Sequence, residues 1–382
     1  MNKYIYYIWL NFFEIPSDKK MRLIEYFGSA EGVFKAGEEE LLMCELLTDK
    51  QIKLILKKNL KPAEKEFKRA EKYGVSFVCI EDENYPESLM NISDPPILLY
   101  LKGDTSLLRR KLCFCIVGTR NASPYGVTAA MQISNQLAEC GMVIVSGLAL
   151  GIDSAAHQGA LRANGKTIGV AACGINVKYP VGTGAQRDAI IEKGLIISEF
   201  PLDCPAYGYN FEKRNRILSG LSLGVAVIEA GLRSGAFITA RHAREQNRDV
   251  YALPGNITSR TSAGCNKLIS EGASAILGVE TILSEYLVRY PELFEIDDYI
   301  EEYKEREKQK EAEFTAEEIY EEINCDGDEE KAVVSLLKEG SKNFEELLDK
   351  TGFQVSHLNV LLTTMQIKGK IKETGGRNFS LK

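Results

Sequence analysis

The stretches LCFCIVGTRNASPYG at residues 112–126 and MVIVSGLALGIDSAAH at 142–157 decide the fold. Each begins with an apolar run rich in valine and isoleucine, passes through a glycine-containing turn and continues into a helical pattern. Four further runs repeat this plan: TIGVAACG at 167–174, LIISEF at 195–200, LGVAVIEA at 223–230 and VYALPG at 250–255. Runs that are apolar on both alternating faces are typical of buried parallel strands. Six such strands alternating with helices predict an α/β fold with a doubly wound, mostly parallel sheet.

The regions on either side of these strands predict smaller domains and a linker. In residues 1–75, apolar side chains recur near helical spacing, and Pro16 and Gly28 separate one helical stretch from the next. This pattern predicts a small helical domain. The sheet-bearing core is expected over 76–290. Residues 291–327 are dominated by Glu and Lys and predict a solvated acidic linker. Residues 328–382 predict three compact helices and a hairpin around Gly375 and Gly376, the plan of a winged-helix domain.

Composition excludes several classes of protein. With 382 residues, 45% hydrophobic and 26% charged, the chain has the make-up of two or three globular domains. Its nine cysteines are scattered, and Cys113 and Cys115 share one strand face, which favours buried thiols over metal ligands. No CxxC pair occurs and only three histidines are present, so we expect no metal and no other cofactor. Without a cleavage site or a run of ~18 apolar residues, the expected location is cytoplasmic, away from membranes.

The formal net charge of -7 is unevenly distributed. Residues 295–330 contain 17 acidic and four basic residues and carry -13, which leaves +6 for the rest of the chain. The acidity therefore belongs to the linker, and the net charge of the whole chain does not exclude nucleic acid as a partner of the folded parts.

The turns after the strands predict where a ligand binds. At the carboxyl edge of a doubly wound sheet, glycines let a ligand approach the backbone and helix N-termini present free amides to anions. Three turns have this composition: GTRNASPYG at 118–126, SGLALGIDSAAH at 146–157 and EAGLRSGAFITAR at 229–241. Ser123 is expected to cap the helix after the first turn, and Asp153 or Ser154 the helix after the second.

These turns fit a chain of phosphates better than a single nucleotide. No G-x-G-x-x-G follows the first strand and no GxxxxGK[ST] occurs, so a standard dinucleotide or P-loop site is not supported. Basic residues lie in or near the turns in sequence, namely Arg120, Lys213, Arg214 and Arg216. Aromatic residues of the same loops either pack or stack on bases, each stack being worth ~1 to 3 kcal/mol. They are Tyr125, Tyr179, Tyr207, Tyr209 and Phe211.

The sequence does not support a catalytic site. A nucleophilic enzyme needs a base beside its nucleophile, and no histidine falls in a recognisable arrangement with Ser or Cys. His157 is one helical turn after Asp153, which predicts a local hydrogen bond between them. Glu199 and Glu229 end buried strands and would suit an acid pair, but their spacing does not show that they meet. We therefore expect a protein that is not an enzyme.

Eight motifs resemble the DNA-processing protein A family, also called DprA or Smf, and occur in family order across about residues 80–290. They are IVGTRNASPYG, VSGLALGIDSAAHQGAL, TIGVAACGINVKYP, ISEFP, FEKRNRILSGLS, SGAFITARHA, VYALPG and SAGCNKLISEGA. The resemblance implies an extended Rossmann-like core, a SAM-like or helix-hairpin-helix domain before it and a winged helix after it. It also implies a homodimer that binds single-stranded DNA, displaces single-strand-binding protein and loads RecA recombinase in natural transformation, without enzymatic turnover.

The resemblance also assigns roles to residues. Arg120 becomes the principal phosphate ligand, and Ser146 and Gly147 line the same pocket. The other implied DNA-binding residues are Gly118, Ser123, Lys178, Tyr179, Phe211, Lys213, Arg214, Asn215, Arg216, Ser234, Gly235 and Thr239. The implied dimer surface is formed by Asn266, Leu268, Ile269, Ala275 and Ile276. Lys178 and Lys213 either replace two lysines that the family usually has on the DNA path, or the groove is less basic here.

Two other functions compete with this interpretation. Phosphoribohydrolases with a Rossmann-like fold have similar glycine-rich loops, so a nucleotide-processing or nucleotide-sensing protein is the alternative. Those enzymes share a PGGxGTxxE stretch, whereas this chain has AGLRSGAFITAR without the final glutamate. A duplex-binding role for the last domain is weaker, because its basic residues are few, and docking to a partner is the favoured role there.

Overall fold

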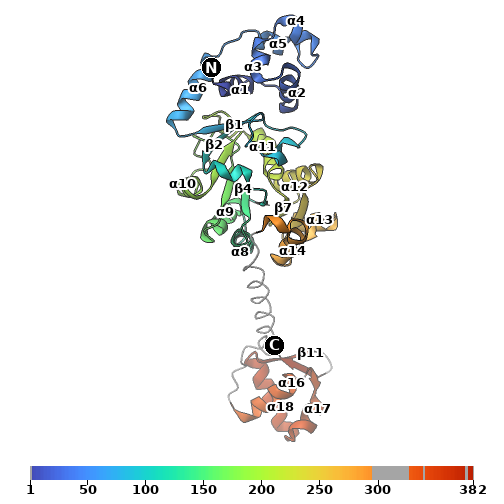
Figure 1. Cartoon of the computed structure of the whole chain (residues 1–382). Helices are drawn as coiled ribbons and strands as arrows, with labels where there is room; N and C mark the ends of the chain where they lie inside the picture. The colour runs from blue at the N-terminus through green and yellow to red at the C-terminus, as the bar shows by residue number, and fades with distance from the viewer. Residues whose placement is uncertain (1, 295–326, 339, 375–376, 382) are drawn as a thin grey trace. The chain divides into compact units, whose positions relative to one another are not determined.

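The computed structural model describes residues 2–294, 327–338, 340–374 and 377–381. The chain divides into two compact units, Met1–Ile296 and Asp297–Lys382, called here the first and the second unit (Figure 1). Most of the predicted linker at 291–327 lies outside the described residues. None of the described helices is both long and apolar enough to cross a lipid bilayer.

A nine-stranded, mostly parallel sheet forms the centre of the first unit, as the sequence predicted. Its order is β1-β2-β6-β5-β4-β3-β7-β8-β9. The six predicted runs form β3 (Cys113–Val117), β4 (Val143–Gly147), β5 (Thr167–Val170), β6 (Leu195–Ser198), β7 (Gly224–Val227) and β8 (Asp249–Ala252), all parallel to their neighbours among these six. At one edge β1 (Ser76–Cys79) and β2 (Leu98–Gly103) add antiparallel pairs, and β9 (Ser274–Ala275) extends the other edge. Cys113 and Cys115 are buried free thiols on β3.

The strand order reverses at β3. From β3 the chain winds through β4, β5 and β6 to one side, and it then crosses back to place β7 on the other side of β3. In Figure 1, α10 (Gly184–Lys193) lies at the left of the first unit, and α9 (Ile152–Arg162) and α8 (Pro124–Glu139) lie towards its lower end. To their right lie α11 (Gly208–Gly220), α12 (Ala236–Glu245) and α13 (Ala263–Ser270). Such a reversal opens a crevice at the carboxyl ends of the two strands.

Six helices precede the sheet, in the region where the sequence predicted a small helical domain. They are α1 (Lys3–Asn11), α2 (Ser17–Phe27), α3 (Ala30–Lys35), α4 (Glu38–Met43), α5 (Asp49–Ile55) and α6 (Lys61–Lys72). α1 is buried all round and places Tyr7, Ile8, Trp9 and Leu10 in a core that is continuous with the apolar residues of the sheet. The helices and the sheet therefore form one compact unit.

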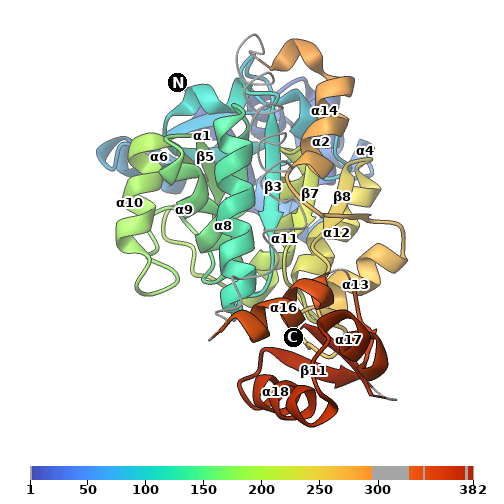
Figure 2. The ribbon, with the colours of Figure 1, turned by 90° about the horizontal axis from the view of Figure 1, so that it is seen from below.

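The remaining elements are short helices of the first unit and the folded part of the second. The first unit also contains α7 (Glu87–Met90), η1 (Thr105–Arg109), α14 (Glu280–Arg289) and η2 (Pro291–Leu293), and Figure 2 shows α14 near β7 and β8. The second unit contains α16 (Asp328–Lys338), β10 (Lys342–Asn343), α17 (Phe344–Thr351), α18 (Val355–Ile367), β11 (Ile371–Thr374) and β12 (Asn378–Leu381). β12 pairs antiparallel with β10 and β11, which confirms the predicted hairpin, although Gly375 and Gly376 lie outside the described residues.

Candidate functional site

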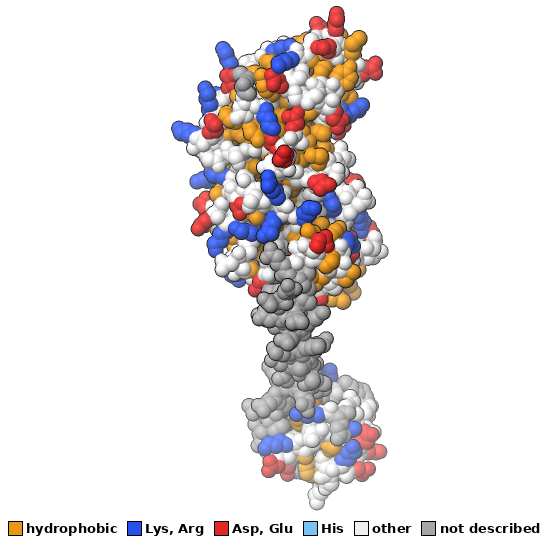
Figure 3. Space-filling view, viewed as in Figure 1, with side chains coloured by type: hydrophobic (Ala, Val, Ile, Leu, Met, Phe, Trp, Pro, Cys, Tyr) orange, Lys and Arg blue, Asp and Glu red, His pale blue; other side chains and the backbone are white. Residues whose placement is uncertain are grey.

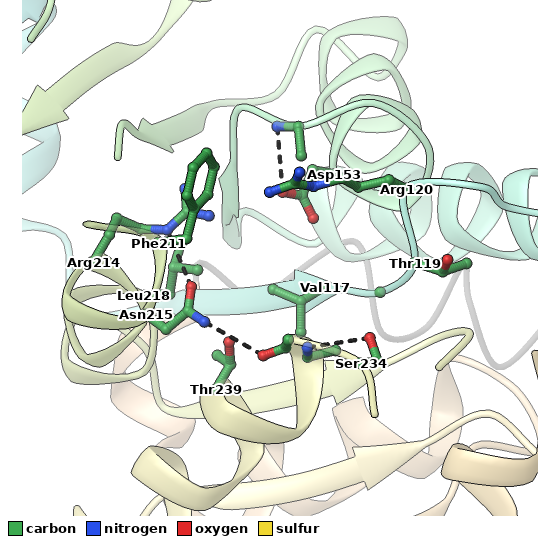
Figure 4. Close-up of a pocket in the computed structure, with 14 residues that line it drawn as sticks. Val117, Thr119, Arg120, Asp153, Phe211, Arg214, Asn215, Leu218, Ser234 and Thr239 are labelled. Carbon is green, nitrogen blue, oxygen red and sulfur yellow. Dashed lines mark hydrogen bonds between the residues drawn. The ribbon is translucent and has the colours of Figure 1, made fainter. Parts of the chain in front are cut away.

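A cavity of about 310 Å³ lies at the carboxyl ends of β3 and β7, where the strand order reverses (Figure 4). We call it the switch-point pocket. It is lined by Val117, Gly118, Thr119, Arg120, Ala149, Asp153, Phe211, Arg214, Asn215, Leu218, Ser234, Gly235, Ala236 and Thr239. These residues come from the end of β3, from the turns after β3, β4 and β7, and from α9, α11 and α12. The predicted convergence of glycine-rich turns at one edge of the sheet is therefore confirmed.

The turn after β3 brings a cation and an aromatic ring together. A Cβ atom on Gly118 would lie 2.6 Å from Cγ1 of Ile152 and 2.8 Å from the carbonyl oxygen of Glu229, so only glycine fits between β7 and α9. Two residues later Arg120 is exposed, and its guanidinium carbon lies 4.6 Å from the ring centroid of Phe211. This is a cation–π contact, which holds the guanidinium at the mouth of the pocket.

A buried arginine and a buried carboxylate form the inner wall. Arg214 is 5% exposed; its Nη1 donates to the carbonyl oxygen of Val170, and its Nε donates to Oδ1 of Asn215 at 3.2 Å. Asp153 accepts the amide N–H of Ala149 at 3.4 Å. Burial raises the pKa of Asp153 although Arg214 opposes that shift. With Arg120 at its mouth, the pocket holds two arginines against one carboxylate.

The amino end of α12 closes the opposite side. Gly235 precedes the helix, and its carbonyl oxygen accepts from Nδ2 of Asn215 at 3.3 Å. Ser234 Oγ accepts the amide N–H of Ala236 at 3.3 Å, and Thr239 is buried one turn further along. The N-terminus of a helix carries a partial positive charge, which suits an anion, although the amides of Phe237 and Ile238 here already bond to the carbonyl oxygens of Ser234 and Gly235.

Glu229 at the end of β7 fixes the turn after β3, a role that the sequence analysis missed. Its carboxylate accepts from the amide N–H and the hydroxyl of Ser123 at 2.8 and 2.6 Å, and from the hydroxyl of Thr261 at 3.2 Å. Ser123 Oγ in turn accepts the amide N–H of Gly126 at 3.1 Å, which confirms the predicted cap of α8. Ser123 therefore positions the turn and does not line the pocket.

Two local predictions around α9 are wrong. The residue that caps α9 is Gly151, which has φ +78° and offers no side chain, so neither Asp153 nor Ser154 caps the helix. His157 does not bond to Asp153, because β5 and the end of β4 present closer partners. Its Nε2 lies 2.8 Å from the carbonyl oxygen of Gly147 and its Nδ1 lies 2.6 Å from Oγ1 of Thr167.

Nine of the fifteen predicted DNA-binding residues lie in or beside the pocket, Gly118 and Arg120 among them, and the other six, which include Ser123, lie elsewhere. Phe211, Arg214, Asn215, Ser234, Gly235 and Thr239 line it, and the ring of Tyr179 is 5.7 Å from that of Phe211. Ser146 is fully buried and donates to the carbonyl oxygen of Ile116 at 2.6 Å. Gly147 lies under the floor, where a Cβ would come within 2.6 Å of Nη1 of Arg214. Lys178 and Lys213 are exposed, and Arg216 faces Glu199 and Asp94 instead of the pocket. Glu199 and Glu229 have separate sets of partners.

The predicted dimer segment is largely used inside the first unit. Leu268 and Ile276 are each 2% exposed, and Asn266 bonds to both the amide and the carbonyl of Gly255 at 3.2 and 2.9 Å. Ile269 and Ala275 are half-buried, on α13 and on the edge strand β9. Of the five predicted interface residues, Asn266, Ile269 and Ala275 are half-buried, and Leu268 and Ile276 are buried.

Comparisons with known proteins identify relatives over most of the first unit. The profile of the family described as DNA recombination-mediator protein A matches residues 76–287. DNA processing protein DprA of Bacillus subtilis is 40% identical over 224 residues, which cover 58% of this chain and 75% of the relative. Protein Smf of Escherichia coli is 37% identical over 280 residues, which cover 72% and 74%.

Two solved structures agree with these relatives. The X-ray structure of DNA processing protein A from Streptococcus pneumoniae superposes with a TM-score of 0.66 at 32% identity, covering 75% of this chain and 98% of that one. A structure of the Helicobacter pylori DNA processing protein A, which describes its single-stranded DNA binding mode, has a TM-score of 0.52 at 33% identity. It covers 56% of this chain and 97% of that one.

Proposed function

The chain belongs to the DNA recombination-mediator protein A family, and on that premise we propose that its switch-point pocket binds single-stranded DNA without reading the base sequence. The observation that carries the proposal is the Arg120–Phe211 pair beside the amino end of α12. An exposed guanidinium and an aromatic ring at one place supply the two contacts that a nucleotide unit offers, a phosphate and a base face. The Helicobacter pylori relative, which binds single-stranded DNA, supports the same ligand class.

The roles of the pocket residues follow from their surroundings. Arg120 has its guanidinium at the mouth, so it can form a charge-assisted, bidentate bond to a phosphate. The amino end of α12 adds the partial positive charge of the helix beside the phosphate, although the amides of Ala236, Phe237 and Ile238 already have acceptors within the chain. Phe211 offers a ring to any base, because every base has an aromatic face. Arg214 is too deeply buried to follow the strand, and it adds positive potential from below.

We also propose the family's wider assembly for this chain. In it, the protein dimerises through the segment around Ile269 and Ala275, holds incoming single strands and loads RecA recombinase onto them in natural transformation. The helices before the sheet act as a SAM-like domain, and the second unit acts as a winged helix that docks a partner. We propose that the protein binds the strand without catalytic turnover.

A nucleotide-processing protein is the second candidate, favoured by one feature. Asp153, with its raised pKa, lies inside a pocket whose 310 Å³ is within the range of small-molecule sites. Incubation with nucleoside monophosphates tests it: released base would support this candidate, and its absence alongside DNA binding would support the first.

Fluorescence anisotropy with labelled oligo-dT tests the main proposal. We expect binding at low salt, with log affinity falling by ~0.7 per log unit of salt for each phosphate neutralised. Arg120→Ala should weaken binding by about tenfold or more, since it removes a charged hydrogen bond. Arg110→Ala is the matched control, because Arg110 is an exposed arginine before the opposite, amino end of β3. Failure of the wild-type protein to bind, or equal losses in the two variants, would refute the assignment.

A further inference from the structure

A second, larger cavity lies on the other side of α11. Its volume is about 610 Å³, and it lies within the first unit between the α1–α2 connection and the start of α11. We call it the N-terminal pocket. Its apolar walls are Phe12, Phe13, Ile15, Pro16, Phe200, Pro201 and Cys204, and its polar lining is Asn11, Glu14, Ser17, Lys20, Asp94, Glu199, Tyr209, Asn210, Lys213 and Arg216. The site described above does not use this cavity.

Lys20 is a buried cation in this pocket. The residue is 5% exposed, and its ammonium has two long hydrogen bonds to one residue, to the carbonyl oxygen of Asn11 at 3.2 Å and to its Oδ1 at 3.4 Å. An ammonium can donate three. No carboxylate in the described part of the chain lies within ion-pair distance of it. Burial lowers the pKa of Lys20 to about 8, which the nearby Glu199 partly opposes. A buried charge without a counter-ion is costly, so an anion entering the pocket would relieve that cost.

The acidic groups of the pocket are mostly committed to Arg216. Its guanidinium holds Glu199 in a bidentate pair, with Nη2 to Oε1 at 2.7 Å and Nη1 to Oε2 at 2.9 Å. Its Nε lies 2.9 Å from Oδ2 of Asp94, and Ser17 donates to Glu199 as well. With these charges paired, Lys20 and Lys213 face only Glu14 among the other charged residues of the lining. Over the whole lining, the charges of Lys20, Lys213 and Arg216 balance those of Glu14, Asp94 and Glu199, so the positive charge of the pocket is local to the two lysines.

The mouth of the pocket repeats the motif found at the switch-point pocket. Lys213 holds its ammonium 5.4 Å from the ring centroid of Tyr209, just as Arg120 lies over Phe211. Tyr209 stacks on Tyr207, with 5.4 Å between the centroids and 9° between the planes. Both tyrosines are about half exposed, at 60% and 47%. The amino end of α11 thus carries two cation–aromatic pairs, Arg120–Phe211 and Lys213–Tyr209, and Tyr207 adds exposed aromatic surface beside the second pair.

No continuous basic surface is needed to connect the two pockets. Figure 3 shows Lys and Arg side chains distributed over one face of residues 2–294, with carboxylates and hydrophobic patches between them. An anionic polymer on such a surface depends on local contacts at a few sites. Both pockets are lined by α11, which has a diameter of about 10 to 12 Å with its side chains, so one strand can reach both.

We propose that a single strand held in the switch-point pocket continues across the amino end of α11 and enters the N-terminal pocket. There a base stacks on the Tyr207–Tyr209 pair, and the next phosphate lies against Lys213 and Lys20. The apolar walls from the α1–α2 connection accept the sugar and the edge of a base. This inference rests on the proposed function, and it assigns a direct DNA contact to the N-terminal helices.

Oligo-dT of increasing length, measured by anisotropy, tests the proposal. Lys20→Met should leave the affinity for the shortest bound oligomers unchanged and weaken longer ones by about tenfold, because only these reach the second pocket. In this variant, the slope of log affinity against log salt for long oligomers should become shallower by ~0.7, because one phosphate contact is lost. Methionine is apolar and of similar length, so it suits the buried position. Lys19→Met is the control, since Lys19 is the neighbour of Lys20 on α2 and does not line the pocket.

Tyr209→Ala gives an independent readout at an exposed position that does not threaten folding. It should weaken long oligomers by about fivefold or more and leave the shortest unchanged. If both variants bind every length as tightly as the wild type, or lose affinity equally at every length, the second pocket is not on the strand path. If the wild-type protein binds no oligomer at all, the proposed function itself fails, which is a different outcome from either of these.

Discussion

The neutral imidazole of His157 should make the first unit sensitive to acid. The ring is 1% exposed, beneath the floor of the switch-point pocket. A carbonyl can only accept, so the neutral ring carries its proton on Nε2 for Gly147, while Nδ1 lies 2.6 Å from Oγ1 of Thr167, whose hydroxyl also bonds to the carbonyl oxygen of Ile144 at 2.7 Å. Burial lowers the pKa of His157 from 6.5 to about 4. The unfolded chain therefore takes up a proton near pH 6.5 that the folded chain refuses until about pH 4.

The sign and the size of the effect follow from linkage. In a pH range where the unfolded state binds more protons than the folded state, lowering the pH decreases the free energy of unfolding. Between pH 7 and pH 5 this histidine alone should remove about 2 kcal/mol from the free energy of unfolding, and about 3 kcal/mol once the pH reaches 4. Stability should thus be highest above pH 6.5 as far as His157 is concerned.

Urea unfolding at pH 7 and at pH 5 measures the effect in the full chain. Trp9 is the single tryptophan, is 3% exposed and belongs to the same apolar core as the sheet, so its fluorescence reports on the first unit. His157→Gln keeps an N–H for the Gly147 carbonyl but cannot titrate. We expect the variant to lose about 2 kcal/mol less than the wild type over this interval. Equal losses in the two proteins would refute the reasoning.

Two further variants test the switch-point pocket. Asp153→Asn should tighten oligo-dT binding several-fold near neutral pH, because the carboxylate repels a phosphate. The variant should also lack any gain in affinity that the wild type shows as the pH is lowered. Weaker binding of the variant in anisotropy would instead show that Asp153 is needed to hold Arg214. Glu229→Ala should lower the melting temperature and the DNA affinity together, because it strands three donors at a cost of about 1 to 3 kcal/mol; scanning fluorimetry with unchanged values in both assays would contradict its role in fixing the turn after β3.

The sheet and the location of the pocket were predictable because both follow from local patterns. Six apolar runs ending in glycine turns specify parallel strands, and the turns then meet at one edge. The sequence predicted less well which single side chains line the pocket, because residues that are neighbours in sequence can point in different directions. Consecutive helix residues differ by about 100° around the axis, so Arg216 points away from the pocket that Arg214 lines. Ser146 likewise lies on a strand, where alternate side chains point to opposite faces.

The missed features depend on partners that are distant in sequence. Glu229 holds Ser123, which is 106 positions away, and no pattern around either residue announces the bond. The N-terminal pocket requires α1 and α2 to meet the end of β6: Nδ2 of Asn11 donates to the carbonyl oxygen of Glu199 across 188 positions, and the hydroxyl of Ser17 reaches its carboxylate across 182. Such contacts arise from packing, which the sequence of one chain does not display.

α11 lines both pockets, and it is held to the sheet by contacts on both of its sides. On one side Arg214 ties the helix to the end of β5 through Val170, and on the other side Arg216 ties it to Glu199 at the end of β6. Burying such charges adds little net stability compared with apolar packing, but breaking one partner of a buried pair costs about 3 to 5 kcal/mol. These contacts therefore fix α11 in one place, because moving the helix elsewhere would leave a buried charge without its partner. A helix held in this way presents Phe211 and Tyr209 at a fixed separation, which a strand crossing its amino end would need.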